Sequence, residues 1–181
     1  ERLLCNAHVC ATEAVVAMYC GLVARIKQDG LKAGLSLKLT HMGLDISEDL
    51  CIANLRHILT DAKANGVPVT IDMESSDYTE RTLRIYRTMR DEYDFTNVGT
   101  VIQSYLYRSR DDMRALAAEG ATIRLCKGAY LEAPEIAFPE KADVDRQFID
   151  IMRDFLAAAG PSCLQIATHD ERIIQDAEAQ I

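Results

Sequence analysis

The stretch LSLKLT, residues 35–40, alternates leucine with serine, lysine and threonine. Successive side chains of a β-strand point to opposite faces, so this stretch predicts a strand with one apolar and one polar face. A second stretch, VTIDME at residues 69–74, has the same pattern and places Asp72 and Glu74 on its polar face. Both strands are therefore expected to carry charged side chains opposite their apolar residues.

Five strand-like stretches recur along the chain, and helical segments separate them. The strands are expected at residues 35–40, 67–73, 98–106, 121–127 and 163–168. Helices are expected from Thr12 to Gln28, from Ser47 to Gly66, from Thr79, from Ser109 to Gly120, and over residues 142–159, where Val144, Phe148, Ile151 and Phe155 form one stripe. Thr79 is expected to cap the third helix, and Ser109 with Asp112 resembles a capping box for the fourth. This alternation predicts right-handed βαβ units and a parallel sheet.

Polar residues occupy one face of every expected strand, although a parallel sheet covered by helices should be mainly apolar. An antiparallel sheet with one solvated face would explain the pattern, but the intervening helices argue against it. A barrel explains both faces, because its inward residues near the carboxyl ends of the strands form the active site. The strongest charges do lie late in their strands: Lys38, Asp72, Arg124 and Lys127. Buried charges are costly unless they are paired or bind a ligand, so this grouping favours a functional site.

The length of the chain argues for an incomplete barrel. A complete barrel has eight strands and about 250 residues, whereas five strands are expected among these 181 residues. No linker, low-complexity tract or change of composition marks a second domain. A doubly wound sheet is still an alternative on these grounds, although no strand is followed by a G-x-G-x-x-G turn and no P-loop is present. We therefore expect residues 1–181 to form one partial α/β domain of the (β/α)8 TIM-barrel type.

Composition and charge argue against several classes of function. The chain is 49% hydrophobic and 27% charged, and its net charge of −8 opposes binding to the phosphate backbone of nucleic acids. No apolar run approaches the ~20 residues that span a bilayer, so no transmembrane anchoring is expected. Six cysteines form no C-x-x-C pair and no spacing with histidine suited to zinc, so neither a metal site nor a redox pair is expected.

Five motifs at the expected strand ends follow one another in order. They are Leu-Ser-Leu-Lys-Leu-Thr (35–40), Ile-Asp-Met-Glu (71–74), Val-Ile-Gln-Ser-Tyr-Leu-Tyr-Arg (101–108), Arg-Leu-Cys-Lys-Gly-Ala-Tyr (124–130) and Ala-Thr-His-Asp (167–170). This series resembles the proline dehydrogenase family over most of the chain from Leu35 onward. The resemblance implies a distorted (βα)8 barrel that holds FAD at its carboxyl-terminal mouth, with L-proline stacked on the flavin.

The resemblance implies roles around the reacting atoms for five residues. Lys38 would help to neutralise the carboxylate of proline, and Asp72 would orient the basic groups around it. Arg124 would lie near flavin N5, where a cation stabilises the electron density gained on reduction. Gln103 would hydrogen-bond the edge of the isoalloxazine ring, and Tyr130 would form a wall of the proline pocket.

The remaining site residues are assigned to FAD by the same resemblance. Lys127 would contact the ribityl or phosphate region, and Thr168 and His169 would contact the distal part of the cofactor. Gly128 and Ala129 would leave room for its close approach. The implied cofactor-binding set is Gln103, Arg124, Cys126, Lys127, Gly128, Ala129, Thr168 and His169.

Two departures from the family pattern bear on activity. Cys126 stands where the family often has valine, at a place where contact with the backbone is expected to matter more than the side chain. The first barrel strand of the family is expected to lie before Glu1. The last strand and helix of the family carry a tyrosine and paired arginines that complete the proline site, and these are not among residues 1–181. We therefore expect the domain to lack its N-terminal first strand and its C-terminal strands and helix, and residues 1–181 alone to be inactive.

The resemblance implies FAD-dependent oxidation of L-proline to 1-pyrroline-5-carboxylate by hydride transfer to flavin N5, the first step of proline catabolism. The reduced FAD would pass its electrons to a quinone or another acceptor. A cytoplasmic location is expected, with peripheral contact with a membrane and oligomer formation both left open.

Two other functions stay open when the residues are considered alone. A Schiff-base aldolase could use Lys38 or Lys127 if desolvation lowered the pKa of the amine. The second alternative is a barrel without catalytic activity. In such a barrel Lys38 or Arg124 would form structural ion pairs with Asp72 or Glu74. Trapping with borohydride would identify the first, and absence of bound flavin would identify the second.

Overall fold

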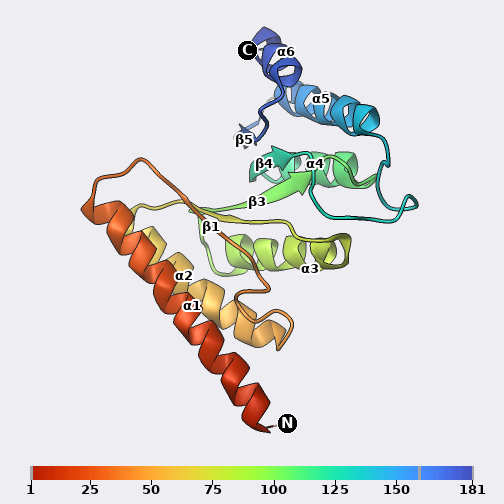
Figure 1. The fold of residues 1–181 in the computed structure, drawn as a ribbon. Coiled ribbons are helices and arrows are strands. Elements are labelled where there is room, and N and C mark those ends of the chain that lie inside the picture. Colours follow the sequence, from red (N-terminus) through yellow and green to blue (C-terminus); the bar gives the residue numbers. More distant parts are fainter. Residues whose placement is uncertain (1, 159, 181) are drawn as a thin grey trace. The chain divides into compact units, whose positions relative to one another are not determined.

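The computed structural model describes residues 2–158 and 160–180, and within these ranges the side chains from residue 11 onward (Figure 1). Strands and helices alternate, as the sequence predicts. In chain order they are α1 (Arg2–Gln28), β1 (Leu35–Leu37), α2 (Glu48–Asn65), β2 (Val69–Ile71), α3 (Ser76–Arg87), the π-helical turn η1 (Thr88–Glu92), β3 (Val98–Gln103), α4 (Ser109–Ala118), β4 (Thr122–Cys126), α5 (Lys141–Ala157), β5 (Cys163–Ile166) and α6 (Glu171–Gln180).

The chain forms two compact units whose segments interleave along the sequence. The first unit runs to Asp72 and also contains Arg81–Gly99. The second contains Met73–Glu80 and the chain from Thr100 onward.

All strand pairs are parallel, and neighbours in the sheet are neighbours in the chain. In the first unit, Leu35 of β1 lies opposite Val69 of β2, and the amide of Val69 donates to the carbonyl oxygen of Asn97 at 2.8 Å, one residue before β3. In the second unit β4 pairs with β3 on one side and β5 on the other. The hydrogen-bonded order is β1-β2-β3-β4-β5. A doubly wound sheet reverses its strand order at a switch point, so this order favours the barrel over that alternative.

The core of the first unit lies between the apolar face of its strands and helix α2. Helix α2 begins after Ser47, whose hydroxyl accepts from the amide of Leu50 at 3.5 Å, and it ends at Gly66 with φ of 71°. Both ends are where the sequence predicts them. Helix α1 runs beside α2 (Figure 1). The buried residues of this core include Leu35, Leu37, Leu39, Cys51, Leu55, Ile58, Leu59, Val69 and Ile71.

The core of the second unit lies between β4 and the helices α4 and α5. Ile123 and Leu125 point to this side of β4 and are fully buried. The expected stripe of α5 is confirmed, since all four of its members are buried: Val144, Phe148, Ile151 and Phe155. The polar members of β4 are only half-buried, so β4 has the two unlike faces that its sequence predicts.

Two of the expected helix caps are wrong. Helix α3 begins at Ser76, so Thr79 lies buried within its first turn and does not cap it. Ser109 is the first residue of α4, and its hydroxyl donates to the carbonyl oxygen of Gln103 at 2.5 Å rather than capping the helix. Asp112 pairs with Arg108 at 2.6 Å instead of completing a capping box. In both helices, the first turn is bound by hydrogen bonds or ion pairs that the expected capping patterns do not include.

Candidate active site

Lys38 and Asp72 lie at the same edge of the first unit's strand pair. Each directly follows its strand, β1 or β2, and both side chains are half-buried. The amide of Asp72 donates to the carbonyl oxygen of Leu37 at 2.8 Å, so the parallel pairing continues to this point. The carboxyl ends of parallel strands are where α/β proteins place their ligands. The structure therefore places at one edge the residue that the resemblance assigns to the substrate carboxylate, Lys38, and the one expected to orient the basic groups around it, Asp72.

A tyrosine that the sequence did not single out joins these two residues. Tyr19 of α1 is 7% exposed. Burial is the main cause that raises the pKa of its phenol, the negative charge of Asp72 raises it further, and the positive charge of Lys38 opposes the rise. Tyr19 is thus within electrostatic range of both residues, and its phenol stays protonated near neutral pH.

Gln103 and Arg124 form the polar face of neighbouring strands in the second unit. Gln103 of β3 is 4% exposed, and its Nε2 donates to the carbonyl oxygen of Met73 at 3.3 Å. Its Oε1 is buried and accepts no hydrogen bond from the residues that the structure describes. Arg124 of β4 is half-buried and donates from Nε to Oε1 of Gln165 at 3.4 Å. Since Gln103 lies opposite Cys126 in the ladder, Arg124 and Cys126 share this polar face.

Lys127 follows β4 and is held by two carboxylates. Its Nζ lies 2.5 Å from Oδ1 of Asp145 and 2.8 Å from Oδ2 of Asp170. Lys141 approaches the same carboxylates, at 2.5 Å from Asp145 and 3.5 Å from Asp170. Desolvation acts to lower the pKa of Lys127, but the hydrogen bonds to Asp145 and Asp170 outweigh it and raise that pKa. Lys127 is therefore a fixed cation.

Gly128 has a conformation and a neighbour that both exclude a side chain. Its φ is +111°, and a Cβ added to it would lie 2.3 Å from the ring of Tyr105. The space beside Gly128 is thus occupied by an aromatic ring, which the sequence did not reveal. Ala129 is exposed, and Tyr130 packs against the buried cluster that contains Tyr105 and Leu106.

Thr168 and His169 lie in the turn between β5 and α6. The hydroxyl of Thr168 accepts from the amide of Asp170 at 3.1 Å, and a carboxylate oxygen of Asp170 accepts from the amide of Arg172 at 3.2 Å. His169 is exposed. The two residues therefore stand at the carboxyl end of β5, the strand that pairs with the strand of Arg124.

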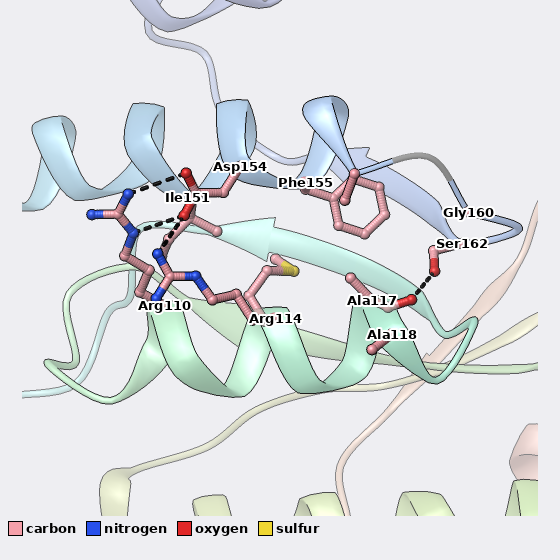
Figure 2. A pocket seen from close by; sticks show the side chains of 11 residues that line it. Arg110, Arg114, Ala117, Ala118, Ile151, Asp154, Phe155, Gly160 and Ser162 are labelled. Atoms are coloured by element: carbon pink, nitrogen blue, oxygen red, sulfur yellow. Dashed lines mark hydrogen bonds and ion pairs between the residues drawn. The ribbon is translucent and has the colours of Figure 1, made fainter.

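A separate pocket of about 180 Å³ lies between α4 and α5 and contains none of the residues expected in the site (Figure 2). Arg110 and Arg114 of α4 both reach Asp154 of α5, at 2.8 and 2.9 Å. Beyond these ion pairs its lining is mostly apolar and includes Met113, Ala117, Ile151 and Phe155. It is a gap between two packed helices whose charged groups already pair with one another.

Neither a metal centre nor a membrane span is indicated in the described part of the chain. No three histidine, cysteine, aspartate or glutamate side chains there are grouped so as to hold a metal ion. Among the described helices, none combines the length and the apolar character that crossing a membrane requires.

In each unit, charged and polar side chains follow consecutive parallel strands at their carboxyl ends, which is the arrangement of the (β/α)-barrel class of enzymes. A family model described as proline dehydrogenase matches residues 8–180. The chain therefore belongs to the proline dehydrogenase family.

Two curated relatives agree with this assignment. The chain is 43% identical over 152 residues to proline dehydrogenase 1 of Bacillus subtilis (strain 168), which covers 84% of this chain and 49% of the relative. It is 41% identical over 150 residues to proline dehydrogenase of Deinococcus radiodurans, covering 81% of this chain and 48% of the relative. The chain thus spans about half the length of the curated relatives it matches.

Solved structures confirm the fold class. Proline utilization A (PutA) from Bdellovibrio bacteriovorus, inactivated by N-propargylglycine, matches 94% of this chain and 22% of that chain, with a TM-score of 0.82 and 22% identity. A mutant of PutA from Bradyrhizobium japonicum matches 95% of this chain and 21% of that chain, with a TM-score of 0.82 and 21% identity. The chain is therefore an α/β protein of the TIM-barrel type, as the alternating strands predict.

Proposed function

We propose that the protein to which this chain belongs oxidises L-proline to 1-pyrroline-5-carboxylate with FAD, and that residues 1–181 form the central part of its barrel. One observation carries the proposal beyond family membership. Gln103 keeps a buried acceptor oxygen that no described residue satisfies, on the face of the sheet that also presents Arg124. An unpaired buried acceptor is costly, so a donor on a bound ligand is the simplest account of it.

The residues of the second unit suit a flavin. The buried amide of Gln103 can accept from an N–H at the edge of an isoalloxazine ring, because its Nε2 is already used by the carbonyl oxygen of Met73. Arg124, on the neighbouring strand, supplies a positive charge on the same face. A bound flavin would supply the hydride acceptor: ring carbon C5 of proline would lose a hydride and the ring nitrogen a proton as the C=N bond forms between them.

The first unit would bind the substrate anion. Lys38 is a cation at a strand end and would neutralise the carboxylate of proline, while Asp72 on the neighbouring strand would orient the basic groups around it. Tyr130, which packs on the buried cluster that contains Tyr105 and Leu106, would form a wall of the proline pocket, as the resemblance implies. Arg124 would stabilise the negative charge that the flavin gains on reduction.

The segment after β4 and the turn after β5 would hold the rest of the cofactor. Lys127 would meet the ribityl or phosphate region as a cation kept charged by Asp145 and Asp170. Thr168 and His169 would contact the distal part of FAD. The backbone would make the main contribution to FAD binding at Cys126, Gly128 and Ala129. Gly128 has no side chain, and the ring of Tyr105 occupies one side of it.

The fixed charge of Lys127 argues against one alternative. A Schiff-base aldolase needs a lysine whose pKa is lowered, so that the free amine can attack a carbonyl. The two carboxylates on Lys127 raise its pKa instead. Lys38 would have to serve this role, and borohydride trapping with a carbonyl substrate would then leave a covalent adduct on Lys38.

The visible spectrum of the full-length protein tests the proposal. We expect flavin absorption that proline bleaches, and a quinone or another acceptor should restore it. Arg124→Met should slow the bleaching, whereas Arg114→Met, a matched change on the α4 surface, should not. Protein without flavin, or flavin that proline does not reduce, would overturn the proposal and favour a barrel without catalytic activity.

We also infer a cytoplasmic location, with peripheral membrane contact if the acceptor is a membrane quinone.

A further inference from the structure

Glu132 reaches from the loop after β4 to the start of α3. Its Oε1 accepts from the amide of Ser76 at 2.7 Å, and its Oε2 accepts from the hydroxyl of Ser76 at 2.6 Å. Ser76 is the first residue of α3, where backbone amides have no partner within the helix and the helix dipole favours a negative charge. Glu132 thus caps α3 from a position 56 residues further along the chain.

The same carboxylate holds the ring that lies against Gly128. The hydroxyl of Tyr105 donates to Oε1 of Glu132 at 3.3 Å, and Tyr105 is only 7% exposed. Its ring occupies the place that a side chain on Gly128 would need. One end of this tyrosine is therefore fixed by Glu132, and its ring is in contact with the backbone of Gly128.

Backbone hydrogen bonds tie the two ends of the same loop to the segment after β3. The amide of Tyr105 donates to the carbonyl oxygen of Lys127 at 2.9 Å. At the other end, the amide of Tyr107 donates to Ile136 at 3.1 Å and the amide of Phe138 donates to Tyr105 at 2.8 Å. Between these ends most residues are exposed: Ala129, Leu131, Ala133, Pro134 and Glu135. Glu132, in the middle of the loop, turns its side chain inward and accepts hydrogen bonds from Ser76 and Tyr105.

The protonation states support a lasting contact. Partial burial acts to raise the pKa of Glu132, but the hydrogen bonds from Ser76 and Tyr105 outweigh it and lower that pKa. Burial, followed by the charge of Glu132, raises the pKa of Tyr105. Glu132 is therefore an acceptor and Tyr105 a donor throughout the neutral range.

We propose that Glu132 is a positioning residue that fixes residues 128–130 in the conformation needed to bind the flavin and proline, acting through Tyr105 and Ser76. This inference rests on the proposed function, which assigns Gly128 and Ala129 to the cofactor and Tyr130 to the proline pocket. A residue with this role sets the fraction of molecules whose loop is ready to bind, and apparent affinity falls in proportion to that fraction. A residue that only stabilised the fold would change the amount of active enzyme and leave KM unchanged.

The test compares Glu132→Ala and Glu132→Gln with Glu135→Ala in the full-length protein. Glu135 is an exposed carboxylate in the same loop, so it controls for loss of charge. The first measurement is hydrogen exchange of the Tyr107 and Phe138 amides in the protein freed of flavin. The second is KM and kcat for proline-dependent dye reduction at saturating FAD.

We expect Glu132→Ala to speed exchange of both amides at least tenfold and to raise KM for proline at least fivefold, with kcat within twofold. Glu132→Gln should lie between, because its amide oxygen can still accept from Ser76 without the charge, and Glu135→Ala should stay within twofold of wild type. Exchange as slow in Glu132→Ala as in Glu135→Ala would overturn the contact. Faster exchange with unchanged KM would overturn the positioning role.

The proposed function and the positioning role of Glu132 can fail separately. If the wild-type protein carries no flavin or ignores proline, the proposed function is wrong, and with it the positioning role, while the exchange data still decide whether Glu132 holds the loop. If Glu132→Ala does not fold, Glu132→Gln and Tyr105→Phe give the same comparison with smaller expected effects.

Discussion

Replacing Gly128 by alanine should destabilise the protein more than replacing Gly66, although both have positive φ. Their φ values are +111° and +71°, and such conformations cost a residue with a Cβ about 1–2 kcal/mol. A Cβ on Gly128 would also lie 2.3 Å from the ring of Tyr105, whereas one on Gly66 would meet no described atom within 4 Å. Relieving that overlap in a packed region costs about 1–3 kcal/mol more. We expect losses of unfolding free energy of about 2–5 kcal/mol for Gly128→Ala and about 1–2 for Gly66→Ala.

Urea unfolding of the full-length protein measures both losses, and a double-mutant cycle identifies their origin. In a Tyr105→Ala background the added Cβ on Gly128 has no ring to meet, so the cost of Gly128→Ala should fall to that of Gly66→Ala. Equal losses at the two glycines, or a cost at Gly128 that does not change when Tyr105 is removed, would refute the steric argument.

Three further predictions concern the charged residues. Arg124→Met should slow reduction of the flavin in stopped-flow experiments more than it weakens proline binding, because its charge matters most as N5 becomes electron-rich; an unchanged rate at saturating proline would contradict this. Lys38→Ala should chiefly raise KM for proline, since the carboxylate is charged in ground and transition states alike; an unaltered KM would remove Lys38 from the site. The hydrogen bond from Lys127 is the main cause that lowers the pKa of Asp170 from 3.8 to about 2. The stability that Asp170 contributes is thus present above pH ~4 and lost as the pH falls towards 2, so urea titrations should show wild type and Asp170→Asn converging over that range.

The strands and most helix ends could be predicted because their signals are local. Alternation in LSLKLT placed β1 and its two faces, and Ser47 and Gly66 marked the ends of α2. The caps of α3 and α4 were missed for the opposite reason. Thr79 and Ser109 have the right residue types, but the first turn of α3 is held by Glu132 and the hydroxyl of Ser109 is used by Gln103. A capping pattern does not show partners outside itself, whether they lie 56 residues away, as Glu132 does from Ser76, or six, as Gln103 does from Ser109.

The residues of the candidate site likewise divide into those that the sequence predicted and those that it missed. The motifs pointed to residues that follow a strand, such as Lys38 and Asp72, or lie within one, such as Arg124, since type and order are visible in the sequence. Tyr19 and Asp145 were missed because each lies in a helix, where a tyrosine resembles a packing residue and an aspartate resembles part of a solvated face. Only the folded chain shows that they approach Asp72 and Lys127 respectively.

The interleaving of the two units limits how this protein can be dissected. The chain passes from one unit to the other after Asp72, after Glu80 and again after Gly99, so neither unit is a continuous stretch of sequence. Helix α3 (Ser76–Arg87) contributes its first turn to one unit and its remainder to the other. A single cut therefore cannot separate the two units: a cut after Gly99 leaves Met73–Glu80 of the second unit with the first, and a cut after Asp72 leaves Arg81–Gly99 of the first unit with the second.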